Sequence, residues 1–375
     1  MAINSGQATL PHGDDGADPG LLADLLAQLG YAEYVGHFNP LAPDPAAWRA
    51  CRLAAPAALR EVIALFLLNE PVAIDALPPA LQALLPDLAA LALIVGEPDA
   101  RVSTGGLVLL PILGHWLFCH PPQANPGFYF NEDSMALLTR MAPRRGTCLD
   151  LCAGPGLHAL HSARYADRVT AVEIDPACAQ LARINARLNR VAGRMEVLEG
   201  DLYQPVAGRR FDTLTANPPL LPYPAGLRPP AIGHGGPDGM EIVWAILHGL
   251  PQALSERGLC QLVGMSLSDG RKPLATDQVA ALAKTSGLDI RLTGLSHISL
   301  APGSAYLGAL LYTVCLVSGQ PFAQVEEAMM ALLGDAGASH VCPIFLSARH
   351  GAGQFELLEL PSDYQHARWH AGARQ

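Results

Sequence analysis

Four polar residues stand at or near the ends of four successive stretches of small apolar residues. Asp150 lies in TCLDL, Glu173 in RVTAVEI, Asp201 follows MEVLEG, and Asn217 ends FDTLTAN. Carboxylate and amide oxygens accept hydrogen bonds from hydroxyl and amino groups. In parallel α/β sheets, ligands bind at the carboxyl ends of the strands. Each residue alone could be a turn or helix-capping residue, but four in order favour a ligand site over packing.

The stretch LDLCAGPGLHAL, at 149–160, adds a glycine-rich turn between a predicted strand and a predicted helix. Gly154 and Gly156 bracket that turn. Glycine lets a ligand approach the backbone closely, and the N-terminus of a helix offers unpaired N–H groups. A turn of this kind can also be purely structural, so it supports the ligand site only together with the strand ends.

The stretch TANPPLLPYP, at 215–224, places Asn217 on a rigid corner. Proline cannot donate to a sheet ladder, so the strand must end there. The residue before a proline is held in extended geometry. A capped turn is the simple interpretation, whereas a polar side chain held on a rigid corner is often functional.

These residues need a scaffold, and the pattern predicts one from residue 147 onward. Apolar strand-like and amphipathic helix-like stretches alternate, which indicates a parallel α/β sheet with right-handed crossovers. Residues 303–339 have a helical pattern and interrupt this alternation between two late strands. We expect these inserted helices over the carboxyl ends of the strands, as a cover for the site, rather than at the sheet edge.

The order DLCAGPG, VEID, GD and NPP resembles the class I S-adenosylmethionine-dependent methyltransferases. The NPP corner and GHGGPDGMEIVWAIL, at 233–247, resemble the subgroup with an NPP[Y/F] motif, which contains protein-glutamine and rRNA-guanine N-methyltransferases. The resemblance covers about residues 128–265. It implies a Rossmann-like class I methyltransferase sheet and S-adenosyl-L-methionine as cofactor.

The resemblance also implies roles for individual residues. The methionine part of the cofactor would be held by the turn and the strand before it, the ribose by Glu173, and the adenine by the Asp201 turn. The implied cofactor-binding residues are Asp150, Ala153, Gly154, Gly156, Glu173, Asp201, Leu202 and Asn217.

The implied catalytic residues are Asn217, Pro218 and Tyr223. Asn217, helped by the Pro218 carbonyl, would accept from the nitrogen that is methylated. The family has an aromatic residue after the second proline, where this chain has Leu220, and Tyr223 follows three residues on. Leucine offers no π face to a planar acceptor, so the chemistry of the acceptor is left open.

We therefore expect N-methyl transfer to a small-molecule or peptide acceptor. One alternative is a cyclase or lyase of the same fold that consumes the cofactor and releases methylthioadenosine, as azetidine-2-carboxylate synthases do. O- or C-methyl transfer, and N-methyl transfer to rRNA or a protein, are the others.

Composition narrows these alternatives. The net charge is -10 and the pI is about 5.7, which argues against a nucleic-acid partner. Half of the residues are hydrophobic, yet no stretch has the roughly 20 apolar residues of a membrane helix. Eight cysteines lack metal-ligand spacing, so no metal is expected and the cysteines indicate a reduced, cytoplasmic protein.

Residues 1–20 are polar and predict a mobile tail, and residues 123–375 predict the methyltransferase domain. Residues 21–122 read as helices followed by extended chain, which is typical of a winged-helix-like module. A DNA-binding regulator is excluded because residues 71–100 contain no Lys or Arg. We expect this module to form a homodimer or to cover the site.

Overall fold

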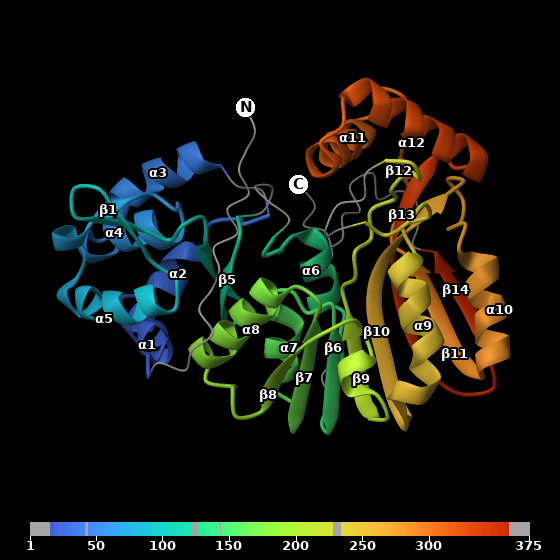
Figure 1. The fold of residues 1–375 in the computed structure, drawn as a ribbon, viewed down its shortest axis with the longest axis horizontal. Coiled ribbons are helices and arrows are strands. Elements are labelled where there is room, and N and C mark those ends of the chain that lie inside the picture. The colour runs from blue at the N-terminus through green and yellow to red at the C-terminus, as the bar shows by residue number, and fades with distance from the viewer. Residues whose placement is uncertain (1–15, 42–43, 122–126, 143, 228–233, 360–375) are drawn as a thin grey trace. The chain divides into compact units, whose positions relative to one another are not determined.

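The structure is a computed structural model, and it describes residues 16–41, 44–121, 127–142, 144–227 and 234–359. Most of the expected tail, 1–20, lies outside these ranges. The chain forms two compact units (Figure 1). The first contains Met1–Asn131, Ala153–Arg164 and Val169–Gly200, and the second contains Glu132–Cys152, Tyr165–Arg168 and Asp201–Gln375. Strands from 147 onward are thus divided between the units.

The N-terminal part of the first unit is helical at first. Its helices are α1 (Gly20–Gln28), α2 (Tyr31–Val35), α3 (Pro45–Ala54), α4 (Ala57–Phe66), η1 (Ile74–Ala76) and α5 (Pro79–Ala90). A three-stranded antiparallel sheet in the order β1-β3-β2 accompanies them, built from β1 (Val72–Ala73), β2 (Val95–Glu97) and β3 (Arg101–Ser103). Helices and a small sheet are present as expected, and the winged-helix assignment itself stays a prediction.

The extended stretch that follows forms a separate hairpin of β4 (Val108–Ile112) and β5 (His115–Cys119). Its turn is Leu113–Gly114, where both residues have positive φ. The Gly105–Gly106 pair, which the sequence marks as a turn, instead separates β3 from β4.

The rest of the first unit is a strand–helix arrangement. It contains α7 (Leu157–Ser162), β7 (Arg168–Glu173), α8 (Pro176–Leu188) and β8 (Met195–Glu199), and β7 pairs with β8 in parallel. The fully buried side chain of Asn185, on α8, joins this part to the hairpin. Its amide accepts from Phe118 N–H and donates to Phe118 C=O, at 3.0 Å each. It also donates to Pro155 C=O at 2.9 Å, so β5, α8 and the glycine-rich turn are tied together.

The second unit is built on a mixed sheet in the order β14-β11-β13-β10-β9-β6. Its strands are β6 (Thr147–Leu151), β9 (Phe211–Ala216), β10 (Leu254–Ser268), β11 (Leu288–Gly294), β12 (Ile298–Ser299), β13 (His340–His350) and β14 (Phe355–Glu359). The pairs β6–β9 and β9–β10 are parallel, as the alternation predicts. β13 is antiparallel to both β10 and β11, so the sheet is mixed rather than wholly parallel.

The helices of the second unit are α6 (Glu132–Leu138), η2 (Gln204–Val206), α9 (Glu241–Ala253), α10 (Thr276–Ser286), α11 (Ala305–Ser318) and α12 (Phe322–Ala336). The central strands are buried on both faces: in β10, the residues from Gln261 to Ser268 are all buried. A continuous run of buried residues of this kind fits a strand covered from both sides.

The inserted helices α11 and α12 leave the sheet between β12 and β13 (Figure 1). Ser304 caps α11 by accepting from Leu307 N–H, and Gly319 ends it in the left-handed region. β12 pairs with the first residues of β13, opposite Ser268 at the carboxyl end of β10. The insertion therefore leaves the sheet from the end where β9 and β10 terminate.

Within the described residues, no single helix combines the length and apolarity that crossing a bilayer requires. The helices α11 and α12, bent by 118° with respect to each other, meet that test only as a pair.

Candidate functional site

Glu173, at the end of β7, lies beside the glycine-rich turn within the first unit. Its side chain is 8% exposed. One carboxylate oxygen accepts from Gly154 N–H at 2.7 Å, and the other accepts from Asp175 N–H at 2.9 Å. Each oxygen keeps a second lone pair, so the carboxylate can accept further hydrogen bonds while it stays fixed by the backbone.

Burial raises the pKa of Glu173 above its ordinary value of 4.5, because a desolvated carboxylate is costly. The N–H groups of Asp175 and Gly154 act against this effect, and the charge of Asp175 adds to it. Asp175 itself accepts from Cys178 N–H and caps α8. The two acids of VEID thus differ in role: Asp175 caps the N-terminus of α8, and Glu173 binds the N–H of Gly154 in the glycine-rich turn.

The turn between β6 and α7 has the strained geometry that the glycines suggest. Cys152, Gly154 and Gly156 all have positive φ. A Cβ on Gly156 would also lie 3.2 Å from Ala182 Cβ and from Met195 Cε, so this position needs glycine for packing as well as for conformation. Ala153 connects the turn to β7, since its N–H donates to Val172 C=O at 3.1 Å.

Asp150 and Asp201 belong to the second unit and differ in exposure. Asp150 is fully buried, and it accepts from the Thr215 hydroxyl of β9 at 2.7 Å. Asp201 is exposed in the turn before η2, where Gln204 N–H donates to its backbone carbonyl at 2.9 Å. Leu202, in the same turn, has φ of 44°.

Asn217 lies immediately after β9, on the proline corner. Its Nδ2 donates to the Ser134 hydroxyl of α6 at 3.3 Å. Its Oδ1 is buried and, among the described residues, has no hydrogen-bond partner. A buried amide oxygen without a donor costs about 1–3 kcal/mol. The side chain is thus held at its nitrogen while its oxygen is available to a donor.

The segment after the corner is held by the GHGGPDG loop. Leu221 forms a bridge with His234, and Gly235 N–H donates to Leu221 C=O at 2.8 Å. Tyr223 N–H donates to Gly236 C=O at 2.9 Å. A Cβ on Gly239, whose φ is 77°, would lie 2.5 Å from Met265 C=O. Glycine is required there because the loop packs directly against β10.

Sequence reasoning missed Asp238 and Trp244, which fix this loop to α9. Asp238 accepts from Met240 N–H at 2.9 Å and from Trp244 Nε1 at 3.0 Å. The Trp244 side chain is half-buried. The signal that could have found the pair is an acid in the loop six residues before a tryptophan in the first turn of the following helix.

Tyr223 and Leu220 are both buried beside the corner, at 6% and 8% exposure. The Tyr223 hydroxyl hydrogen-bonds to Ser318, the last residue of α11. Burial raises the pKa of Tyr223, and this hydrogen bond acts against the rise. The Tyr223 ring lies 5.8 Å from that of His234.

The amino end of α11 is also anchored near this corner. The Tyr306 hydroxyl lies 3.2 Å from Met265 Sδ, on β10. Burial and the nearby Asp133 and Glu132 of α6 raise the pKa of Tyr306. Both ends of α11 therefore contact elements next to Asn217, and the expected cover over the site stays a prediction.

Comparison with known proteins identifies the family. Residues 129–288 match the family model described as methyltransferase small domain. Over 173 residues the chain is 30% identical to a Methanocaldococcus jannaschii protein named "putative protein N5-glutamine methyltransferase", and the match covers 44% of this chain and 84% of that protein. The chain belongs to the class I S-adenosylmethionine-dependent methyltransferases. The recognition from sequence motifs is confirmed.

This methyltransferase is also 36% identical over 152 residues to a release factor glutamine methyltransferase of Moorella thermoacetica. That match covers 37% of this chain and 54% of the relative, so the chain spans about half the length of that relative. A solved tRNA m1G37 methyltransferase of M. jannaschii aligns over 67% of this chain and 57% of its own, with a TM-score of 0.40 and 11% identity.

The residues of this methyltransferase fit the cofactor of the family, S-adenosylmethionine. A buried carboxylate with remaining lone pairs suits hydroxyl donors, and among the described residues, chain neighbours aside, no atom lies within 4 Å of where a Cβ on Gly154 would stand. The named relatives methylate proteins, and they give no support to a cofactor-cleaving cyclase or to O- or C-methyl transfer.

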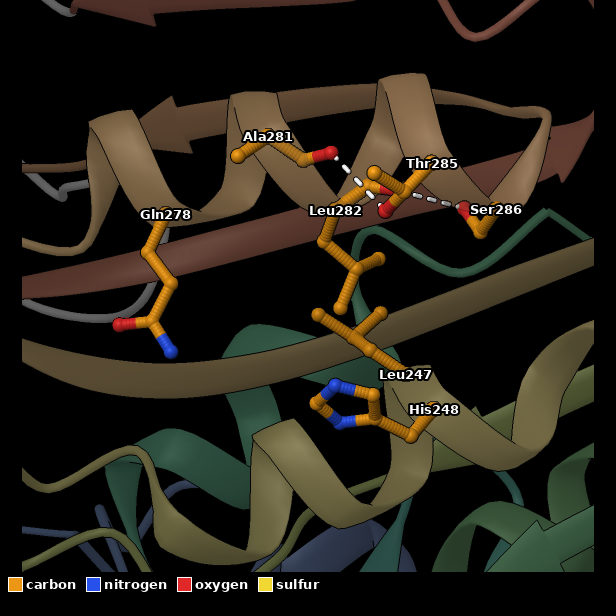
Figure 2. Close-up of a pocket in the computed structure, with 7 residues that line it drawn as sticks. All are labelled: Leu247, His248, Gln278, Ala281, Leu282, Thr285 and Ser286. Carbon is orange, nitrogen blue, oxygen red and sulfur yellow. Dashed lines mark hydrogen bonds between the residues drawn. The ribbon is translucent and has the colours of Figure 1, made fainter.

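A groove of about 390 Å³ lies between α9 and α10, away from these residues (Figure 2). Its lining is Leu247, His248, Gln278, Ala281, Leu282, Thr285 and Ser286. Nothing in this lining matches a predicted site residue. Among the described residues, no group of three or more His, Cys, Asp or Glu is arranged to hold a metal ion.

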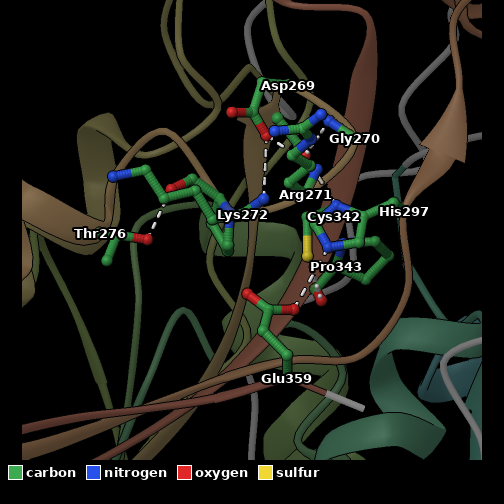
Figure 3. A network of polar contacts seen from close by, with 11 residues as sticks. Asp269, Gly270, Arg271, Lys272, Thr276, His297, Cys342, Pro343 and Glu359 are labelled. Carbon is green, nitrogen blue, oxygen red and sulfur yellow. Dashed lines mark hydrogen bonds and ion pairs between the residues drawn. The ribbon is translucent and has the colours of Figure 1, made fainter. Parts of the chain in front are cut away.

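A cluster of hydrogen-bonded polar side chains lies at the carboxyl end of β10 (Figure 3). The Ser268 hydroxyl lies 2.7 Å from His297 Nδ1, and His297 Nε2 lies 3.2 Å from a Glu359 carboxylate oxygen. Ser268 also accepts from Gly270 N–H at 2.9 Å and is fully buried. Despite its similarity to a Ser–His–acid relay, we interpret the cluster as a structural link between β10, β12 and β14.

Proposed function

We propose that this protein transfers a methyl group to the side-chain amide nitrogen of a glutamine in a protein. The observation that carries the proposal is Asn217 Oδ1, which is buried and unpaired among the described residues. An acceptor amide supplies the N–H group that this oxygen lacks. The names of the relatives, which act on protein glutamine, favour a protein over a small-molecule acceptor.

The family resemblance supports a cofactor role for several residues. Glu173 would accept from ribose hydroxyls, and Gly154 and Gly156 would shape the turn that meets the methionine part. The Asp201–Leu202 turn would meet the adenine. Asp150, whose carboxylate already accepts from Thr215, would position the turn from the end of β6.

When bound, S-adenosylmethionine supplies a methyl group that its sulfonium makes electrophilic. Asn217 Oδ1 would accept one N–H of the acceptor amide, and the Pro218 carbonyl would accept the other. With both N–H groups held, the nitrogen lone pair is directed to one side. Positioning of this kind is worth roughly 7–11 kcal/mol of the barrier, and Tyr223 would stabilise the corner that provides it.

The same placement explains the role of Leu220. This residue is buried beneath the corner, and the Gly239 loop packs on its backbone carbonyl. Leucine therefore fills the position after the prolines without stacking on the acceptor. A flexible aliphatic amide, such as a glutamine side chain, needs no stacking partner, whereas a planar base gains from one.

The test is incubation of the full chain with methyl-labelled cofactor and a purified release factor or ribosomal protein uL3, the proteins named for the relatives. We expect S-adenosylhomocysteine to accumulate with methylglutamine in the protein, as detected by peptide mass spectrometry. Methylthioadenosine in its place would support the cyclase alternative, and label on a different side-chain type would contradict the amide acceptor.

We further propose that the enzyme acts in the cytoplasm, where proteins of translation are its acceptors. A homodimer through residues 21–122 stays a prediction. Sedimentation velocity on the full chain tests it, because a dimer sediments clearly faster than a monomer of 39.5 kDa.

A further inference from the structure

The helix α11 exposes one face that consists entirely of apolar side chains. Ala305, Ala309, Tyr312 and Leu316 follow helical spacing and are all exposed. Tyr312 is 65% exposed and Leu316 is 53% exposed. The opposite face, which includes Leu311 and Val314, is buried.

The neighbouring helix α12 extends this surface. Phe322 is 50% exposed and Met330 is 39% exposed. We call Ala309, Tyr312, Leu316, Phe322 and Met330 the α11–α12 face. Large apolar side chains gathered on neighbouring helices, rather than scattered singly, mark an interaction surface.

The helix that carries this face is anchored to the acceptor corner by its buried side. Ser318, two residues after Leu316, is buried and hydrogen-bonds to Tyr223, and Tyr306 contacts β10 next to the corner. The helix has 14 residues and is about 21 Å long. The exposed side chains of α11 therefore lie on its outer side, which a protein that reaches Asn217 beside α11 can contact.

The charges around the face indicate the charge of its partner. Residues 292–348 contain no Lys or Arg, whereas Glu326, Glu327 and Asp335 of α12 are exposed. Glu326 stands between Phe322 and Met330 at i, i+4 spacing, so acids lie within and beside this face. Such a face complements a segment that is apolar and basic. The net charge of -10 acts in the same direction over a longer range.

Two other occupants fit the charges less well. An anionic membrane surface attracts Lys and Arg, which this region lacks. In a symmetric dimer the same patch meets its own copy, and this would bring the acids of two α12 helices together.

We propose that the α11–α12 face docks an apolar, basic segment of the protein acceptor. This inference rests on the proposed protein-glutamine activity and specifies its substrate class: proteins whose methylated glutamine lies near such a segment.

The experiment measures binding to the full chain by fluorescence anisotropy, with two labelled 14-residue peptides. Both carry one central glutamine and the same leucine stripe at helical spacing; the remaining positions are lysine in one and glutamate in the other. At low salt we expect the lysine peptide to bind at least about tenfold more tightly, because opposite charges attract across the contact.

Variants separate the apolar and charged contributions. Tyr312→Ser with Leu316→Ser should weaken lysine-peptide binding about tenfold or more, since the apolar area is lost. Glu326→Gln with Glu327→Gln should reduce the preference for lysine over glutamate. Leu53→Ser is the matched control, because Leu53 is 64% exposed on α3 and should leave binding unchanged.

Equal binding of the two peptides, or parent-like binding by the Tyr312/Leu316 variant, would overturn the proposal. So would flotation with zwitterionic or anionic vesicles that this variant abolishes, which assigns the face to lipid. A parent dimer that the same variant converts to a monomer assigns it to a second copy.

The peptide assay needs neither cofactor nor turnover, so it separates the two proposals. The lysine and glutamate peptides test the α11–α12 face, whereas methyl transfer by Asn217→Ala tests the acceptor corner. If that variant keeps full methyl transfer, the proposed function fails while peptide binding is unaffected.

Discussion

The residues predicted to bind the cofactor and the acceptor, each within its own unit, differ in how their polar groups are paired. On the cofactor side, both oxygens of Glu173 accept backbone N–H groups from Gly154 and Asp175. On the acceptor side, Asn217 is held only at its nitrogen by Ser134, and its oxygen has no partner among the described residues. The Glu173 carboxylate thus has hydrogen-bond partners without a ligand, whereas Asn217 Oδ1 lacks a hydrogen-bond donor until an acceptor supplies one.

This difference has an energetic meaning. A buried unpaired acceptor costs about 1–3 kcal/mol of stability in the free protein, and that energy is recovered when an acceptor amide binds. Destabilised groups of this kind gather at functional sites. The cofactor side should therefore respond to substitution through binding, and the acceptor side through turnover.

The largest expected effect is on the acceptor side. Asn217→Ala should lower kcat about 10²–10³-fold, as loss of one hydrogen-bonding group at a reacting centre commonly does. Cofactor affinity should stay within a few-fold, and the melting temperature should not fall, because an unpaired acceptor is removed. Steady-state kinetics, calorimetry and thermal unfolding measure the three quantities.

Asn39→Ala is the control for that variant, because Asn39 is exposed and its side chain only accepts from Leu41 N–H in a turn. It should leave kcat and cofactor affinity unchanged. A variant at Asn217 with parent-like kcat would remove the basis of the acceptor assignment.

The next effect is on the cofactor side. Glu173→Ala should weaken S-adenosylmethionine binding by about 1.5–3 kcal/mol, because the ribose hydroxyls and the Gly154 and Asp175 N–H groups all lose an acceptor. Calorimetry measures the affinity. Glu199→Ala is a matched control, since Glu199 pairs with Glu173 in the β7–β8 register but forms an ion pair with Arg183. Unchanged affinity in Glu173→Ala would contradict the ribose role.

A smaller effect is expected at Ser134, which we propose as a positioning residue. Ser134→Ala removes the hydroxyl that holds the Asn217 amide, so kcat should fall about three- to tenfold, corresponding to one hydrogen bond of roughly 0.5–1.5 kcal/mol. Cofactor affinity should not change. Ser134→Thr keeps a hydroxyl and should restore kcat, which a purely structural role of this position would not predict.

The sequence predicts the cofactor side more completely than the acceptor side. Strand ends, a glycine turn and an acid follow from patterns within about 25 residues of chain. Ser134 lies 83 residues before Asn217, and its contact with it depends on where α6 packs. No local pattern carries that information.

For the fold, too, local sequence patterns predict the elements but not the contacts between distant parts of the chain. Alternation of strands and helices predicts β6–β10 and the late helices, because each element has its own apolar period. The direction of β13, which is antiparallel to β10 and β11, is not contained in its apolar period, because it depends on the end of the sheet at which the chain re-enters after α11 and α12. The hairpin turn lies at Leu113–Gly114, although the Gly105–Gly106 pair is the stronger turn signal in the sequence.

The last prediction concerns the pH dependence of stability and of cofactor affinity, which should involve Glu173 and not Asn217. Burial raises the pKa of Glu173 above 4.5. Between 4.5 and that raised value the native state binds more protons than the unfolded state. The free energy of unfolding of the cofactor-free protein should therefore fall as pH rises through this window, by at most about 1.4 kcal/mol per pH unit. Ribose hydroxyls favour the ionised carboxylate, so cofactor affinity should change in the opposite direction and weaken as pH falls. Thermal unfolding and calorimetry of the parent and of Glu173→Gln between pH 4 and 7 measure both trends. Glu173→Gln should lose the pH dependence of both the unfolding free energy and the cofactor affinity that this carboxylate causes. Asn217→Ala should keep both pH dependences. Identical pH profiles in the parent and in Glu173→Gln would show that this carboxylate is not the titrating group.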